Sequence, residues 1–158
     1  MEYGGVCNLS VIRKLAMPVH CSITFPRISD EEMRSIDYRV MEHVFATHNE
    51  IGRLADELVY HKELLRRLLD AGINALLAIP ISLQFRDFSI PLEMDLVVEQ
   101  KAIYELKTVA TLLPIHFGQL VQYIYLSNAT HGKLVNFRTS SVETRFVNTT
   151  LSSDDRRC

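Results

Sequence analysis

Hydrophobic residues recur at helical spacing in the first half of the chain. Ser29 and Glu32 have the spacing of a capping box, and the apolar residues that follow repeat with the period of an α-helix. We predict a break near His48 and Asn49, then a second helix that runs from about residue 50 to residue 70 and ends before Gly72. The first half of the folded chain is therefore predicted to be a pair of helices.

The hydrophobic period changes from 3.6 to 2 after Gly72, which indicates strands. Pro114 is well placed in the first turn of a third helix. The predicted segments are strands at 79–85, 91–98 and 102–107, a helix at 114–127, and strands at 134–137 and 142–147. The predicted order is therefore helix, helix, three strands, helix and two strands.

The chain has 158 residues, which is the size of one domain. We predict an irregular N-terminal arm at 1–28, a folded domain at 29–148 and a polar tail at 149–158. The sequence has no apolar run long enough to span a bilayer, and its three cysteines are too few and too scattered for a disulfide framework. We therefore expect a cytoplasmic protein that has no membrane partner.

The overall charge does not by itself identify a partner. Seventeen basic residues against nineteen acidic residues give a formal net charge of -2, so no general positive field attracts nucleic acid. Candidate chemistry has to come from the placement of individual side chains.

Glu57 is the first candidate, because a helical wheel places it within the apolar stripe of the second helix, among Leu54, Leu58 and Leu64. A carboxylate that faces a core needs a hydrogen-bonding partner, an ion pair or a metal ion. The alternative is a glutamate at the end of the buried face that reaches solvent or caps a neighbouring segment. The sequence leaves both interpretations open.

The second and third strands contain the next candidates. If the turn between them has the three residues 99–101, Asp95 lies opposite Glu105, and Glu93 lies opposite Lys107. Like charges that face each other repel, so a cation is expected between Asp95 and Glu105, and two carboxylates suit Mg²⁺ or Mn²⁺. Lys107 projects from the same face as Glu105 and could reach a phosphate oxygen.

Two alternatives compete with this interpretation of the hairpin. The charged residues could lie on a solvent-facing strand surface, which is their usual location. A two-residue turn would place Asp95 and Glu105 on opposite faces of the sheet. The metal-site hypothesis therefore depends on the register of the hairpin.

The third predicted helix carries a polar stripe of His116, Gln119 and Tyr123 beside an apolar stripe that includes Leu120 and Val121. The amide of Gln119 could orient a water molecule or hold a phosphate near the carboxylates. Alternatively, the helix is half exposed and the polar stripe faces solvent.

These residues resemble the PD-(D/E)XK nuclease superfamily, and most closely its GxxExxY proteins. The segments that carry the resemblance are HNEIGRLADELVYHKEL (48–64), MDLVVEQKAIYELKTV (94–109), LLPIHFGQLVQYIYL (112–126) and GKLVNF (132–137). The resemblance implies an α/β restriction-endonuclease-like core, in which a mixed sheet is flanked by helices. It also implies metal-dependent hydrolysis of phosphodiester bonds.

The resemblance also implies roles for the candidate residues. Asp95 and Glu105 correspond to the metal-binding carboxylates, Glu57 corresponds to the acidic residue of the preceding helix, and Lys107 corresponds to the lysine of the motif. The glutamine and tyrosine of the helix that follows the hairpin correspond to Gln119 and Tyr123.

The sequence thus favours a nuclease that uses Mg²⁺ or Mn²⁺ to activate water and that acts on nucleic acid, with DNA the expected substrate. The alternatives are a catalytically silent module that binds nucleic acid or a protein partner, and a purely structural subunit. A homodimer is one open possibility for its oligomeric state. The nearest basic residues for phosphate contacts are Arg53, Lys62, Arg66 and Lys133.

Overall fold

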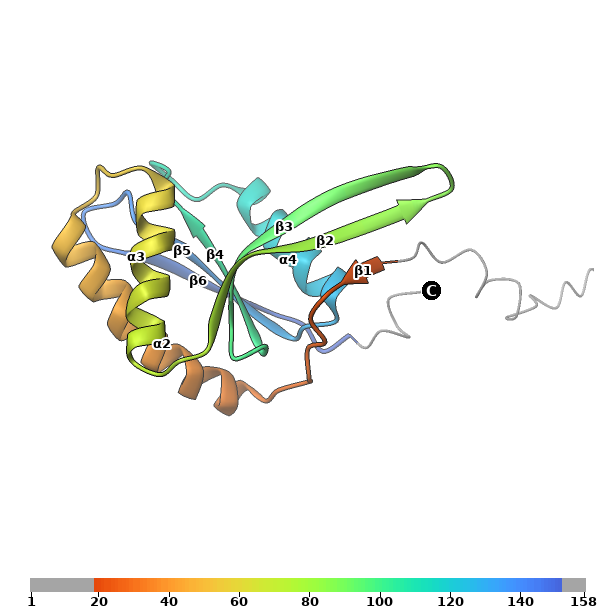
Figure 1. Cartoon of the computed structure of the whole chain (residues 1–158). Helices are drawn as coiled ribbons and strands as arrows, with labels where there is room; N and C mark the ends of the chain where they lie inside the picture. Colours follow the sequence, from red (N-terminus) through yellow and green to blue (C-terminus); the bar gives the residue numbers. More distant parts are fainter. Residues whose placement is uncertain (1–18, 152–158) are drawn as a thin grey trace, which may run out of the picture.

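The computed structural model describes residues 19–151, which form one six-stranded sheet with helices on both faces (Figure 1). The strands lie side by side in chain order, and only β4 and β5 are parallel to each other. The strands are β1 (Val19–Cys21), β2 (Ala75–Phe85), β3 (Phe88–Val98), β4 (Ala102–Lys107), β5 (His131–Asn136) and β6 (Glu143–Asn148). The predicted α/β class and mixed sheet are confirmed.

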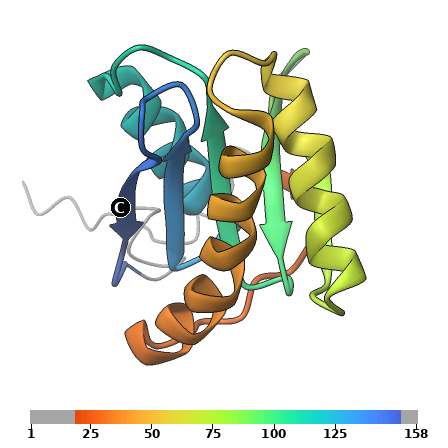
Figure 2. The ribbon, with the colours of Figure 1, turned by 90° about the vertical axis from the view of Figure 1, so that its left-hand side faces the viewer.

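The helices divide the core into two halves. Helices α2 (Asp30–Ile51) and α3 (Glu57–Asp70) cover one face of the sheet, and α4 (Pro114–Ser127) covers the other (Figure 2). Helix α4 also makes the crossover that a parallel pair such as β4 and β5 requires. Within the described residues, no helix combines the length and hydrophobicity needed to cross a bilayer.

The boundary between the first two helices differs from the prediction. The Ser29 side chain caps α2 as expected, accepting a hydrogen bond of 3.1 Å from the backbone N–H of Glu32. However, α2 continues beyond the predicted break to Ile51, and α3 begins only at Glu57. Gly52 ends α2 because it adopts a φ of 79°, and its N–H donates to the carbonyl of His48 over 2.8 Å.

Strand β1 was not foreseen, because it has only three residues and lies within the segment predicted to be irregular. It pairs antiparallel with β2 through Val19–Leu83 and Cys21–Ile81. Residues 1–18 of the predicted N-terminal arm and residues 152–158 of the predicted tail lie outside the described residues.

Gly132 on β5 lies at the closest approach between the sheet and α4. A Cβ atom at this position would lie 2.8 Å from Leu120 Cδ1, 3.0 Å from Ile124 Cδ1 and 3.0 Å from the carbonyl oxygen of Ile103. The absence of a side chain at Gly132 therefore allows α4 to pack directly on the parallel strands.

Gly132→Ala is accordingly expected to lower the free energy of unfolding by about 1–3 kcal/mol, because the added methyl group overpacks this contact. Urea denaturation measures the change. Gly118→Ala is the matched control, since a Cβ at Gly118 in α4 meets nothing within 4 Å, and alanine should raise helix stability by up to about 1 kcal/mol. A Gly132→Ala protein as stable as Gly118→Ala would contradict the packing argument.

Candidate active site

The register of the β3–β4 hairpin brings the predicted acidic pair together. The pairs Val98–Ala102 and Leu96–Tyr104 confirm the three-residue turn, so the alternative two-residue turn is wrong. Regular pairing ends at Leu96–Tyr104, and Asp95 and Glu105 occupy the next positions. The two strands thus separate at the acidic pair.

Asp95 stabilises the backbone at the point of separation. Its Oδ2 accepts a hydrogen bond of 2.9 Å from the backbone N–H of Leu106, which lies beyond the last paired residues. The predicted pairing of Glu93 with Lys107 is wrong. Glu93 is exposed and pairs with Pro80 of β2, whereas Lys107 pairs with Asn136 of β5, because the two strands have already diverged.

Glu105 is fully buried, so a solvent-facing strand surface does not describe it. Its Oε1 accepts a hydrogen bond of 2.6 Å from Lys107 Nζ, while its Oε2 is buried and has no hydrogen-bond partner. Burial and the negative charge of Asp95 raise the pKa of Glu105 to about 8, although the bond to Lys107 opposes this rise. A positive charge beside Oε2 would stabilise the ionised form of Glu105.

Lys107 is positioned as predicted, with its ammonium group on the same side as the Glu105 carboxylate. Burial alone would lower the pKa of Lys107, but the bond to Glu105 and the nearby charges of Asp95 and Glu57 raise it. The ammonium group is therefore charged at neutral pH. Only 13% of the side chain is exposed, which directs this charge into the site.

Glu57 does not lie in the middle of the apolar stripe, contrary to the wheel. Leu54 precedes α3 and is 77% exposed, and Leu58 is 58% exposed. The buried stripe is Tyr60, Leu64 and Leu68, and Glu57 lies in the helical turn before it. The structure thus agrees with the alternative, in which the glutamate lies at the end of the buried face and reaches solvent, because the Glu57 side chain is 41% exposed.

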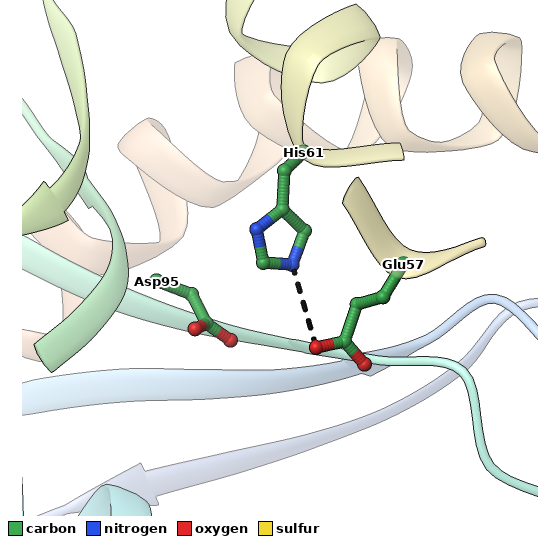
Figure 3. Close-up of side chains that lie close together, drawn as sticks. All are labelled: Glu57, His61 and Asp95. Carbon is green, nitrogen blue, oxygen red and sulfur yellow. Dashed lines mark ion pairs between the residues drawn. The ribbon is translucent and has the colours of Figure 1, made fainter. Parts of the chain in front are cut away.

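Glu57 nevertheless points toward the acidic pair. Its Oε2 accepts a hydrogen bond of 3.4 Å from Thr108 Oγ1, directly after β4. One ligand atom each from Glu57, His61 and Asp95 lies within 4.8 Å of the others. Figure 3 shows the three side chains close together. The first turn of α3 and the end of β3 thus converge on one point.

His61 is the residue that the sequence analysis missed. It lies four residues after Glu57, and this spacing places two side chains on the same face of a helix. His61 Nε2 is 3.9 Å from Glu57 Oε1 and, although buried, has no hydrogen-bond partner. The signal was present in the sequence, because a histidine one turn after a candidate ligand is itself a candidate ligand.

Helix α4 contributes a polar pair, the half-buried Gln119 and the buried Tyr123. Gln119 Nε2 donates a hydrogen bond of 2.9 Å to the hydroxyl of Tyr123, which is only 3% exposed. Burial and the charges of Glu105 and Asp95 raise the pKa of Tyr123, which therefore keeps its proton. Tyr123 is buried rather than facing solvent, but His116 and Gln119 are only half-buried, so the half-exposed alternative describes part of the helix.

The other residues of α4 differ in part from the prediction. His116 does not join the carboxylates, because its Nδ1 accepts a hydrogen bond of 2.9 Å from the backbone N–H of Leu113 and so caps the helix. Val121 is 49% exposed, so it does not belong to the buried apolar stripe, whereas Leu120 is fully buried.

Two side chains hold the loop that leads into α3. The buried hydroxyl of Tyr60 donates to the carbonyl of Gly52 over 2.7 Å and accepts from the N–H of Ala55 over 3.2 Å. Arg138 bridges the carbonyls of Ala55 and Thr108 at 3.2 and 3.3 Å. These bonds fix the start of α3, and with it Glu57, relative to the end of β4.

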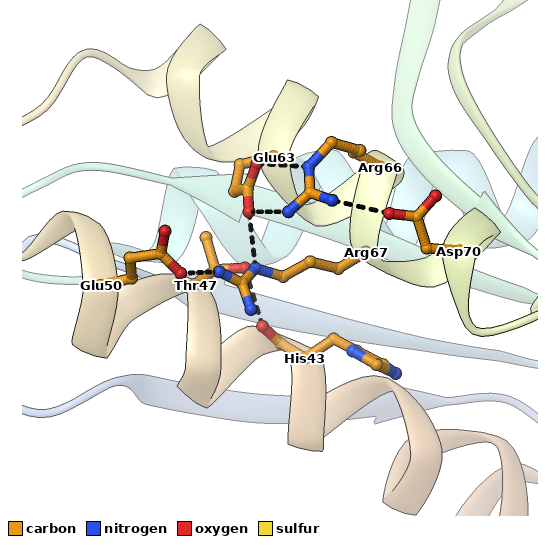
Figure 4. Close-up of polar contacts among 7 residues, drawn as sticks. All are labelled: His43, Thr47, Glu50, Glu63, Arg66, Arg67 and Asp70. Carbon is orange, nitrogen blue, oxygen red and sulfur yellow. Dashed lines mark hydrogen bonds and ion pairs between the residues drawn. The ribbon is translucent and has the colours of Figure 1, made fainter.

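Two of the four basic residues proposed for phosphate contacts are engaged elsewhere. Arg66 pairs with Glu63 at 2.7 Å and with Asp70 at 2.6 Å (Figure 4). Lys133 is only 4% exposed and pairs with Asp37 at 2.7 Å. The buried Lys133 is therefore not placed to bind a phosphate backbone, whereas Arg66 is exposed but already pairs with two carboxylates of its own helix.

The pairs of Arg66 belong to an ion-pair network on the outer surface of the helical layer. Arg67 of α3 pairs with Glu50 of α2 and, at 2.7 Å, with Glu63. Since α2 and α3 are joined by this network, its charges serve helix packing. Arg53 and Lys62, both exposed, remain candidates for phosphate contacts.

The donor set fits a divalent cation. Carboxylate oxygens suit Mg²⁺ and Mn²⁺, and imidazole nitrogen suits Mn²⁺ and later transition metals. Two buried ligand atoms, Glu105 Oε2 and His61 Nε2, have no hydrogen-bond partner, and buried polar atoms rarely remain unsatisfied. A cation bound by Asp95 and these neighbours would meet that need.

A mixed sheet whose central hairpin separates at a carboxylate pair and a lysine defines the nuclease-like class of α/β proteins. The chain belongs to the PD-(D/E)XK nuclease superfamily, whose family model matches residues 34–147. This confirms the broader of the two family resemblances inferred from the sequence.

One similar solved structure is titled "Crystal structure of SSO0001". It aligns with a TM-score of 0.44 and 19% identity, over 73% of this chain and 65% of that chain. The present chain thus spans about 65% of the length of that protein. The search of curated proteins found no match.

Proposed function

We propose that the protein is a metal-dependent nuclease of the GxxExxY group that hydrolyses phosphodiester bonds in DNA. The observation that carries this proposal is Glu105, a fully buried carboxylate with one unsatisfied oxygen, which lies beside Lys107 and next to Asp95. A sheet built for stability alone would gain nothing from this arrangement, whereas a bound cation would offset the cost of burying the carboxylate.

Asp95 and Glu105 would hold Mg²⁺ or Mn²⁺, with Glu57 as a further ligand from α3. When bound, the cation supplies Lewis-acid stabilisation of the phosphate and activates water for attack on phosphorus. Lys107 would position the attacking water or offset the charge that develops on the phosphoryl oxygens. Gln119 and Tyr123 would support Lys107 and Glu105 from the α4 side and contact the substrate.

The experiment compares cleavage of single-stranded, duplex and branched DNA and of RNA across Mg²⁺ and Mn²⁺ titrations. Wild type is expected to cleave DNA only with a cation, and Asp95→Asn and Lys107→Met should each reduce the rate by about a hundredfold or more, since each removes a charge that acts on the transition state. Glu93→Gln is the matched control, because Glu93 is an exposed acid on the same strand as Asp95. This variant should cleave DNA like wild type.

Equal cleavage by all four proteins would indicate a contaminating nuclease and reject the proposal. If no substrate is cleaved, calorimetric titration of the protein with Mg²⁺ or Mn²⁺ tests whether the site binds a cation. If wild type also binds no cation, or if Asp95→Asn binds it equally well, the chain is a silent nuclease-fold module.

A further inference from the structure

We propose that His61 is a direct ligand of the cation, together with Glu57 and Asp95, and that this imidazole makes the site prefer Mn²⁺ to Mg²⁺. The inference rests on the proposed function, since it concerns the same site. It goes further by adding a ligand and a metal preference that the carboxylates alone do not imply.

The spacing of the three side chains is the first argument. His61 Nε2 lies 3.9 Å from Glu57 Oε1, which is too long for a hydrogen bond, and the three ligand atoms all lie within 4.8 Å of one another. With metal–ligand bonds of about 2.1 Å, two ligands of an octahedral ion are about 3 Å apart when adjacent and about 4 Å apart when opposite. The 3.9 Å between His61 and Glu57 therefore fits two ligands of one ion, and Asp95 lies near enough to both for a side-chain rotation to bring its carboxylate to the same ion.

The environment of the imidazole is the second argument. The His61 side chain is 13% exposed, and its Nε2 is buried without a hydrogen-bond partner. Leaving a buried polar nitrogen unsatisfied costs about 1–3 kcal/mol. Figure 3 shows this nitrogen directed toward Glu57, with Asp95 on the other side of the ring.

Glu105 lies outside the group formed by Glu57, His61 and Asp95, but it gives separate support for a cation near Asp95. Its buried Oε2 also has no hydrogen-bond partner, and Glu105 lies next to Asp95, which belongs to both groups of side chains. Two unsatisfied ligand atoms, one on α3 and one on β4, thus flank the same aspartate.

The competing explanation is that His61 forms an ordinary ion pair with Glu57 on the same helix. Such a pair would be expected to close to hydrogen-bonding distance, since both side chains can rotate, but the two atoms remain 3.9 Å apart. The two explanations differ in whether the ring nitrogen bonds to a metal, and this can be measured directly.

The metal preference follows from the chemistry of the ligands. Mg²⁺ binds oxygen almost exclusively and retains several waters, so a nitrogen ligand adds little to its affinity. Mn²⁺ accepts both carboxylate and imidazole, and later first-row metals bind imidazole more strongly still. A site with two carboxylates and one imidazole should therefore favour Mn²⁺.

The decisive measurement is pulsed electron paramagnetic resonance on the full chain loaded with Mn²⁺. A directly bound imidazole gives a ¹⁴N coupling to the Mn²⁺ electron spins. We expect this coupling in wild type, its loss in His61→Gln, and its retention in His20→Gln, because His20 is exposed on β1 outside the site. Mn²⁺ bound to wild type without ¹⁴N coupling would overturn the inference, and this readout needs no variant to fold.

Calorimetry provides the second readout. His61→Gln should weaken Mn²⁺ binding by about tenfold or more and Mg²⁺ binding by less than about threefold. An unchanged ratio of the two affinities would overturn the inference but leave the proposed nuclease intact, provided that Asp95→Asn still abolishes binding. The absence of any cation binding by wild type would instead reject both proposals.

Discussion

Replacing Glu105 with glutamine is expected to stabilise the metal-free protein while it reduces cleavage by about a hundredfold or more. Glutamine keeps the shape of the side chain, and its amide oxygen can still accept the bond from Lys107. It removes an acidic group that is fully buried next to Asp95 and whose ionisation is costly there. The same substitution removes a carboxylate that the cation needs, so stability and activity should change in opposite directions.

The pH dependence of this stabilisation follows from the raised pKa of Glu105. Below pH 4.5, the ordinary pKa, the carboxyl group is protonated in both the folded and the unfolded chain and costs nothing. Between pH 4.5 and about 8, the unfolded chain loses this proton and the folded chain keeps it, which favours unfolding. The advantage of Glu105→Gln should therefore grow through this range, to an order of a few kcal/mol.

Urea denaturation in EDTA at pH 5 and pH 8 measures this difference. Glu93→Gln serves as the control, because its exposed side chain should give nearly the same stability as wild type at both values. A Glu105→Gln protein that is less stable than wild type at pH 8 would show that the bond to Lys107 outweighs burial. Added Mn²⁺ should then stabilise wild type and Glu93→Gln but not Glu105→Gln, since only the first two proteins retain both metal-binding carboxylates.

The carboxylate pair could be predicted because hairpin register depends on a short local feature. The polar turn of residues 99–101 fixes Val98 opposite Ala102, and every other pair follows from that one. The pairing of Glu93 with Lys107 failed for a physical reason that the sequence does not express. The strands diverge after the Leu96–Tyr104 pair. There the Asp95 carboxylate, rather than a backbone carbonyl of β3, accepts the hydrogen bond from the N–H of Leu106.

The position of Glu57 could be predicted only in part. The helical wheel assumed one helix from about residue 50, but the left-handed conformation of Gly52 ends α2 and delays the start of α3 to Glu57. Leu54 consequently lies in a loop, and the apolar stripe begins one turn later than expected. The direction of Glu57 was still predicted, since it shares a helix face with Tyr60 and Leu64.

Lys133 shows why exposure is harder to predict than secondary structure. A lysine on a strand is usually exposed, so a phosphate contact was a reasonable expectation. Its burial depends on Asp37, which lies 96 residues away in the sequence, and on Phe146, whose ring centroid is 4.2 Å from Lys133 Nζ. Neither contact leaves a local signal near residue 133.

Lys133→Met is expected to lower the free energy of unfolding by about 3–5 kcal/mol, the largest loss of stability predicted for this chain. The substitution leaves Asp37 buried without its cation, with only the Tyr104 hydroxyl still donating to its Oδ1 over 3.1 Å. Because Asp37 lies on α2 and its two partners lie on β5 and β4, the loss should loosen the helical layer on the sheet. Urea denaturation measures the effect.

Two control proteins test whether the loss of stability in Lys133→Met comes from leaving a buried charge unpaired. The first is Lys101→Met, which removes a lysine from an exposed ion pair. Lys101 pairs with Glu32 at 2.7 Å, but both side chains are more than a third exposed, Lys101 at 35% and Glu32 at 41%. Lys101→Met should therefore lower the free energy of unfolding by about 1 kcal/mol or less.

The second control combines Asp37→Leu with Lys133→Met. This double variant should recover most of the lost stability, because apolar side chains often replace a buried ion pair without penalty. A double variant no more stable than Lys133→Met would show that the contact between the Lys133 ammonium group and the Phe146 ring stabilises the sheet more than the ion pair with Asp37 does.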